Sequence, residues 1–157
     1  MFEKDNIYTL DGGVLSAMMF SGISRSLDVL AVGKGARGGA NNPDIPDARQ
    51  RKLETEVTRK AFSSVVFRDS QGNVSAVPTN VVDFTTTFLG GEANDALNEM
   101  GLISLQGQAA AANTDNYPAR DLTRDLNNFD VLVNYLTFPV INKPNGSVLA
   151  ITWRLTF

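Results

Sequence analysis

The sequence predicts a mostly-β fold, an antiparallel and jelly-roll-like β-sandwich with long loops and one or two short helices. Segments rich in β-branched and aromatic residues recur along the chain at fairly even spacing. Clusters of Gly, Pro, Asn and Asp separate them, as turns separate the strands of a sandwich. The length of 157 residues and the hydrophobic content of 43% suit one domain, residues 1–157.

The first third of the chain is expected to hold a short helix, a buried strand and a long loop. The first half of residues 14–30 suits a helix that places Leu15, Met18 and Met19 on one face. Residues 27–32 have the apolar composition of a buried strand. Repeated Gly, Pro, Asn and Asp make residues 33–47 a long irregular loop.

The middle of the chain alternates strands with polar segments. Residues 48–58 are highly charged and suit either a short helical turn or the polar approach to a strand. Strands are expected at residues 61–68, 74–77, 81–89 and 99–104. Residues 69–73 have turn composition, residues 93–98 suit one helical turn, and residues 107–128 form a long surface insert.

The last part of the chain carries the clearest strand signals. Residues 131–138 have high β-propensity, and Asn145-Gly146 predicts a hairpin turn. Residues 148–157 alternate between apolar and polar side chains, which fixes the register because a slip of one residue would expose the apolar face. The expected core comprises Phe84, Phe88, Leu149, Ile151, Trp153, Leu155 and Phe157.

Composition excludes several kinds of chemistry. The chain has no Cys and no His, so it cannot form a thiolate nucleophile, a Ser-His-Asp triad or a Cys/His zinc site. A net charge of -3 offers no general attraction for phosphate, so nucleic acid is not an expected partner. No apolar run approaches the length of a membrane helix, and the first residues lack the pattern of a signal peptide.

Two sequence patterns could mark functional sites, but we assign a site to neither of them. The spacing Gly33-x-Gly35-x-x-Gly38 matches a dinucleotide fingerprint, but Pro43 and its neighbours leave no room for the helix that would bind the pyrophosphate. Acidic residues recur towards the end of the insert, at Asp115, Asp121, Asp125 and Asp130. We interpret them as a solvated loop with local ion pairs, and we assign no catalytic, cofactor-binding or metal-binding residue and no cofactor.

Several segments together resemble a known family. They are Leu-Asp-Val-Leu-Ala-Val-Gly-Lys-Gly at 27–35, Leu-Glu-Thr-Glu-Val-Thr-Arg-Lys-Ala at 53–61, Asn-Glu-Met-Gly-Leu-Ile at 98–103 and Leu-Ala-Ile-Thr-Trp-Arg-Leu-Thr-Phe at 149–157. Their order resembles tailed-bacteriophage virion proteins of the tail-collar and tail-fibre N-terminal type. Lys34 and Met100 depart from the family pattern. The resemblance implies structural attachment inside a phage particle without catalysis.

These observations predict a non-enzymatic virion protein that is assembled in the host cytoplasm. Its expected partners are other virion subunits at the tail, collar or baseplate, and copies of itself; no membrane is an expected partner. Residues 33–47, 49–60 and 105–128 are the expected contact segments, because long loops on a rigid β scaffold commonly carry contacts. Two alternatives stay open: a capsid decoration protein on the head surface, and a host-glycan-binding module.

Overall fold

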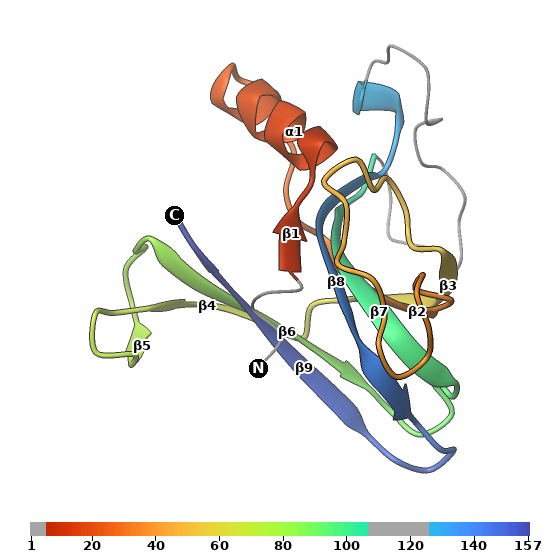
Figure 1. Ribbon diagram of the computed structural model, residues 1–157. Coiled ribbons are helices and arrows are strands. Elements are labelled where there is room, and N and C mark those ends of the chain that lie inside the picture. Colours follow the sequence, from red (N-terminus) through yellow and green to blue (C-terminus); the bar gives the residue numbers. More distant parts are fainter. Residues whose placement is uncertain (1–5, 107–125) are drawn as a thin grey trace.

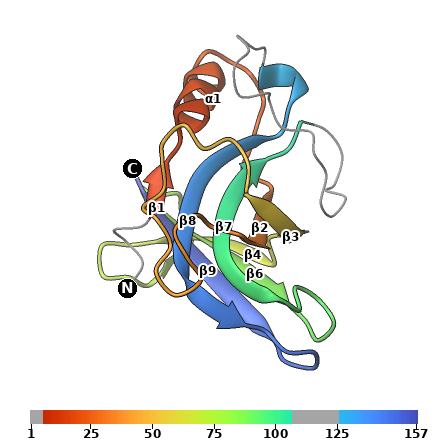
Figure 2. The ribbon, with the colours of Figure 1, turned by 45° about the vertical axis from the view of Figure 1, so that its right-hand side comes forward.

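A computed structural model describes residues 6–106 and 126–157, which form two antiparallel β-sheets and one α-helix. The expected mostly-β fold with two sheets is thereby confirmed. Figure 1 shows the two sheets close together at one end of the molecule and further apart at the other, with the helix above the open end. Figure 2 shows the strong curvature of the longest strand, which follows the twist expected of an antiparallel sheet.

The first sheet has five strands in the order β1-β8-β7-β2-β3. Its strands are β1 (Asn6–Tyr8), β2 (Val29–Lys34), β3 (Thr55–Ala61), β7 (Ala96–Ser104) and β8 (Val131–Asn142). The second sheet has four strands in the order β5-β4-β6-β9. Its strands are β4 (Ser64–Arg68), β5 (Val74–Ser75), β6 (Val81–Phe88) and β9 (Leu149–Thr156). Every strand pair is antiparallel.

The helix α1 (Leu10–Phe20) covers the start of β8, and a 3₁₀ turn, η2 (Leu126–Asn128), precedes that strand. Thr9 caps the helix, because its hydroxyl accepts a hydrogen bond from the Gly12 N–H at 2.9 Å. A Cβ at Gly12 would lie 2.9 Å from the Val133 carbonyl oxygen, so glycine permits the close approach of helix and strand. The helix begins earlier than expected, and its buried face holds Leu15 and part of Met18, whereas Met19 is exposed.

The main core lies between the sheets and confirms most of the expected core residues. Phe84, Phe88 and Trp153 are buried, and the inward side chains of β9 at Leu149, Ile151 and Leu155 pack against the core while partly buried. The prediction for Phe157 is wrong, since this side chain is 78% exposed. The sheets diverge towards the C-terminus, so no opposing sheet covers the last residue (Figure 1).

Three local predictions are wrong, and the first two share a reason. Residues 61–68 are not one strand, because β3 ends at Ala61 and the chain crosses to the other sheet before β4 begins at Ser64. Asn145-Gly146 forms a turn with a φ of 90° at the glycine, but it joins β8 of one sheet to β9 of the other and is no hairpin. Residues 93–98 contain no helical turn, since β7 begins at Ala96. Local composition marks a turn but does not select the partner strand.

Residues 48–58 approach a strand and form no helical turn, because the chain is extended from Thr55 onwards in β3. The irregular loop expected at residues 33–47 begins after Lys34 and continues as far as β3. The rest of the insert at residues 107–125 lies outside the described residues.

The hydroxyl of Thr86 yields a test of packing in the core. Thr86 is fully buried on β6, and the described residues provide its hydroxyl with no hydrogen-bond partner. Thr86→Val replaces that hydroxyl by a methyl group, so the free energy of unfolding should rise by about 1 kcal/mol. Urea denaturation measures this change. In the control Thr85→Val, the hydroxyl removed is paired with Thr152 at 2.9 Å, and no gain is expected. A less stable Thr86→Val variant would contradict the assignment.

Candidate partner-binding surface

The glycine motif of the second strand forms no dinucleotide site. Gly33 lies within β2, which pairs antiparallel with both β3 and β7, and no helix follows it before β3. Gly35 and Gly38 have φ values of 89° and 100°, so they serve turns in the loop. A Cβ at Gly33 would lie 2.5 Å from the Thr55 carbonyl oxygen, so that glycine permits close strand packing.

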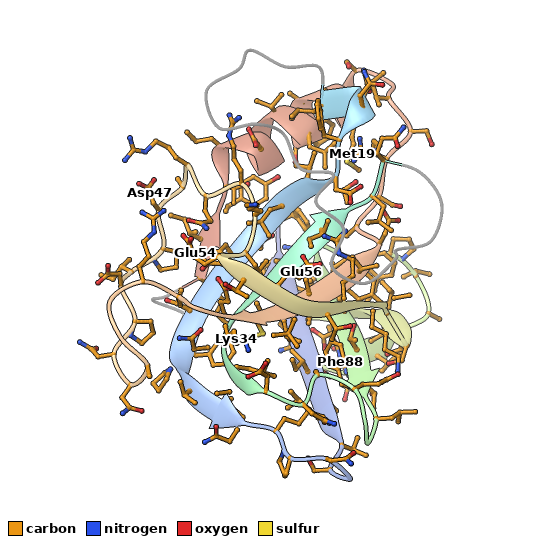
Figure 3. All side chains as sticks on the ribbon, turned by 90° about the vertical axis from the view of Figure 1, so that its right-hand side faces the viewer. Met19, Lys34, Asp47, Glu54, Glu56 and Phe88 are labelled. Carbon is orange, nitrogen blue, oxygen red and sulfur yellow. The ribbon has the colours of Figure 1, made fainter. Side chains whose placement is uncertain are left out.

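The charged segments expected to bind partners make many of their contacts within this chain. Lys34 pairs with Asp95 at 2.6 Å, and Arg37 pairs with Glu54 at 2.9 Å. In Figure 3, Lys34, Glu54 and Glu56 lie on the face that carries β3. Lys60 of β3 pairs with Glu92 at 2.6 Å. Of these pairs, Arg37–Glu54 lies within the loop of residues 35–54, and the role of this loop in binding a partner stays a prediction.

One ion cluster of β3 is buried. The Arg59 side chain is fully buried and donates to Glu56 at 2.7 and 2.9 Å and to Asp130 at 2.9 Å. The other oxygen of Asp130 accepts from the Gln106 backbone N–H at 3.0 Å. Asp130 therefore joins the two ends of the insert to the sheet and is no member of a solvated loop, which corrects our interpretation of this residue. Asp115, Asp121 and Asp125 lie outside the described residues.

Another buried group of polar atoms lies around β7. Glu99 is fully buried and accepts hydrogen bonds from the backbone N–H groups of Glu54 and Thr55, at 3.0 and 2.9 Å, and from the Tyr135 hydroxyl at 2.5 Å. Burial raises the pKa of Glu99 above its usual range, and burial with the nearby carboxylate raises the pKa of Tyr135. Through its bonds to Glu54 and Thr55, Glu99 fixes the loop before β3 to the sheet. Neither Glu99 nor Tyr135 lines the two cavities described below.

The outer face of the second sheet carries a second ion cluster. Asp83 of β6 is 1% exposed and accepts hydrogen bonds from Arg68 at 2.8 Å and from Arg154 at 2.7 and 3.0 Å. These two guanidinium groups, chiefly that of Arg154, hold the pKa of Asp83 below its usual range. The cluster ties β4, β6 and β9 together across the sheet.

Residues 6–106 and 126–157 contain no group of three or more acidic side chains placed to hold a metal ion. Over the same described ranges, no helix combines the length and the apolar composition needed to span a membrane.

One candidate for a functional site is a groove between α1 and the end of β9, with a volume of about 910 Å³. We call it the α1–β9 groove. It is lined by Asn6, Tyr8, Ser16, Met19, Phe20, Asn134, Arg154, Leu155, Thr156 and Phe157. These residues come from both ends of the described chain and from β8 between them. No Asp or Glu side chain lines the groove.

The walls of the α1–β9 groove expose large apolar side chains to solvent. Phe20 is 94% exposed, Phe157 78%, Tyr8 44% and Met19 41%. A cluster of this kind is unusual on a monomeric protein surface and is typical of a site that another molecule covers. Aromatic residues and methionine are also enriched at the centres of protein interfaces.

The groove also contains a buried polar atom. Asn134 is 4% exposed, and the described residues provide its Oδ1 atom with no hydrogen bond. Such an atom is costly in a folded protein unless a donor from elsewhere reaches it. The groove thus combines exposed apolar side chains with polar ones at Asn6, Ser16 and Thr156, which suits an apolar segment that also carries hydrogen-bonding groups.

A second cavity of about 280 Å³ lies at the other end of β9. Its lining combines core residues of the first sheet with both faces of β9, at Leu149, Ala150, Ile151 and Thr152. The cavity therefore extends from the core to the outer edge of this strand.

Sequence reasoning missed the α1–β9 groove, although one signal was present. Met18, Met19 and Phe20 are consecutive apolar residues at the end of a helix. Successive helical residues point about 100° apart, so three in a row cannot all face the core. Comparison of the chain with protein-family models and with curated proteins finds no match.

Proposed function

We propose that this protein is a non-enzymatic structural subunit of a tailed-bacteriophage virion, placed in the tail, collar or baseplate or as a fibre adaptor. The observation that carries the proposal is the α1–β9 groove, whose exposed apolar walls suit a contact with another protein subunit. The resemblance of residues 27–35, 53–61, 98–103 and 149–157 to virion proteins supplies the setting.

The chemistry of the groove supports binding over catalysis. Its only charged side chain, Arg154, is already held by Asp83. The buried ionisable groups at Glu99, Tyr135 and Arg59 lie away from the groove and hold strands and loops together. A general acid or base must reach its substrate within hydrogen-bond distance, and no Asp or Glu lines this groove.

Imaging of phage particles tests this placement. Gold-labelled antibodies against the protein should mark the tail or neck of intact particles, and a stained gel should show a low copy number. Label spread over the whole head at high copy number would assign the alternative function, a capsid decoration protein. Absence of the protein from purified particles would refute the structural role in either place.

A substitution in the groove tests whether this surface makes the contact. Phe20→Ser should leave the free energy of unfolding within about 0.5 kcal/mol of the wild type, because the side chain is 94% exposed. Incorporation into particles should fall by roughly tenfold or more if Phe20 anchors the interface. Complementation of a phage that lacks the protein, followed by quantitative blotting of purified particles, measures this effect.

Val77→Ser is the matched control for Phe20→Ser. Val77 is also an exposed apolar residue, at 64%, but it lies outside the groove and outside the expected contact segments. Normal incorporation of the Val77 variant and poor incorporation of the Phe20 variant support the groove as the contact. Equal incorporation of both variants at the wild-type level would remove the groove from the proposal.

A host-glycan-binding module is the second candidate, because three aromatic side chains, Tyr8, Phe20 and Phe157, border the groove. Aromatic rings bind sugars through their apolar faces. Titration of the isolated protein with cell-surface glycans of the host, followed by changes in nuclear magnetic resonance shifts, tests this candidate. Saturable shifts confined to groove residues would favour it over the subunit contact.

A further inference from the structure

We propose that β9 is a dimerisation strand, which pairs antiparallel with β9 of a second copy of this chain. The pairing would join the four-stranded sheet of one copy to the four-stranded sheet of the other across a twofold axis. The inference concerns the isolated protein in solution, so it holds or fails independently of the virion role proposed above.

The first observation is that β9 is an unprotected edge. Folded proteins prevent edge strands from pairing by shortness, charge, bulges or cover. Over the residues that the structure describes, the other three edges have such protection. β1 has three residues and β5 has two, while β3 carries three charged residues and faces a register irregularity at Val32/Gly33. β9 has eight residues, all of them paired regularly with β6, and no described strand pairs with its outer side.

The second observation is the direction of the free backbone groups. The Phe157 N–H donates to the Asn80 carbonyl at 2.9 Å, and the Thr85 carbonyl accepts from Ser63 on the far side of β6. Antiparallel ladders alternate, so Leu155, Trp153 and Ile151 direct their backbone groups towards β6. The intervening residues of β9 then direct theirs outward, and these are Ala150, Thr152, Arg154 and Thr156. A row of unpaired donors and acceptors is a template for another strand.

The third observation is that apolar surface lies beside this edge. The cavity of about 280 Å³ reaches Leu149 and Ile151 from the edge of β9, and Val148 just before the strand is 61% exposed. A strand placed beside β9 would cover these side chains and remove them from water, which stabilises the association.

The strand is complementary to itself, which favours a second copy as the occupant. Its only charged residue is Arg154, whose guanidinium is already bound to Asp83. In an antiparallel pair centred on Thr152, each Arg154 lies opposite Ala150 of the copy, and Trp153 lies opposite Ile151. No like charges meet, and apolar side chains lie opposite apolar side chains, which is the favourable arrangement for cross-strand neighbours.

Thr152→Pro tests the pairing by removing an outward N–H. Because Thr152 directs its backbone groups away from β6, this N–H makes no bond within the sheet, and the variant should keep its fold. Circular dichroism checks the fold. Because the twofold axis repeats the loss in both copies, the dissociation constant of the dimer should rise by roughly tenfold or more. Sedimentation velocity over a range of concentrations measures it. Thr152→Val is the control, since it loses the hydroxyl bonded to Thr85 but keeps the N–H.

Single cysteines give a second measurement that does not depend on a disruptive variant. The chain has no Cys, so an introduced thiol can form a disulfide only with the same residue of another copy. Opposed Thr152 residues would have Cα atoms about 5.5 Å apart, within the range that a disulfide spans. Thr152→Cys should therefore cross-link under mild oxidation. Thr156→Cys is the matched control, because its copies would lie about 27 Å apart in this register.

Three outcomes would overturn the inference. One is a wild-type protein that stays monomeric at all concentrations. Another is a dimer that Thr152→Pro leaves as tight as the wild type. The last is equal cross-linking of Thr152→Cys and Thr156→Cys, which would indicate random collision of thiols.

Discussion

Arg59→Met is expected to lower the free energy of unfolding by about 3–5 kcal/mol. The Arg59 side chain is fully buried, and its partners Glu56 and Asp130 have side-chain exposures of only 8% and 6%. Removal of the guanidinium would take one cation away from two carboxylates in a poorly solvated place. Loss of one partner of a buried ion cluster is far more destabilising than loss of a surface pair. Chemical denaturation at neutral pH measures the change.

Two further variants separate the loss of charge from the loss of packing. Arg49→Met removes an arginine that is 71% exposed and pairs with Asp47 on the surface, so it should cost less than about 1 kcal/mol. Addition of Glu56→Gln to Arg59→Met should restore part of the lost stability, because it removes the negative charge of one of the two carboxylates that lost the guanidinium. A double variant less stable than Arg59→Met would show that the ion cluster is not the cause.

Glu99→Ala is expected to have an effect of similar size, with a loss of about 3–5 kcal/mol. The Glu99 carboxylate accepts three hydrogen bonds, from Glu54, Thr55 and Tyr135, and the side chain is fully buried. Truncation leaves all three donors without their acceptor and creates a cavity. Glu99→Gln keeps an acceptor and the volume of the side chain, so it should lose less. Equal stability of the alanine variant and the wild type would contradict the assigned network.

The pH dependence of stability tests the same residue independently. Burial raises the pKa of Glu99 in the folded protein above its ordinary value of 4.5, so the folded state holds this proton more tightly than the unfolded state. The contribution of Glu99 to stability is therefore full below the ordinary pKa and decreases as the pH rises through the folded pKa. As the pH rises from the ordinary pKa of Glu99 through its raised pKa in the folded protein, the wild type should lose stability relative to Glu99→Gln.

Glu92→Gln provides a control of opposite sign for the pH measurement. The Lys60 ammonium holds the pKa of Glu92 below its usual range. Its contribution to stability is present above the ordinary pKa and is lost as the pH falls through the folded pKa. Denaturation of both variants and the wild type across the acid range measures the two slopes. Slopes of the same sign for Glu92 and Glu99 would contradict the burial of Glu99.

Much of the fold could be predicted from local sequence patterns. The alternation over residues 148–157 correctly places Leu149, Ile151, Trp153 and Leu155 on the inner face of β9, because a strand with period 2 can bury only one face. The same argument holds for Val82, Phe84, Thr86 and Phe88 on β6. It fails at Phe157, since alternation predicts direction but cannot show whether an opposing sheet extends that far.

The buried charges lie beyond the reach of such patterns. The sequence placed Arg59 in a charged segment at the surface and Glu99 in an ordinary strand. Both side chains are fully buried. Arg59 needs Asp130, which lies 71 residues away in the sequence, and Glu99 needs Tyr135, which lies 36 residues away. A charge can be buried only when partners from other elements bond to it, and single-sequence periodicity does not contain those partners.

The sequence by itself determined the fold class, the direction of the main apolar side chains and the absence of Cys and His chemistry, because these depend on residue type and short spacing. The tertiary structure alone decided which strands pair, that the Asn145-Gly146 turn crosses between the sheets, and which edge stays open. It also assembled the α1–β9 groove from Tyr8, Asn134 and Phe157. These features arise from contacts between distant segments, whose free energies depend on packing in three dimensions.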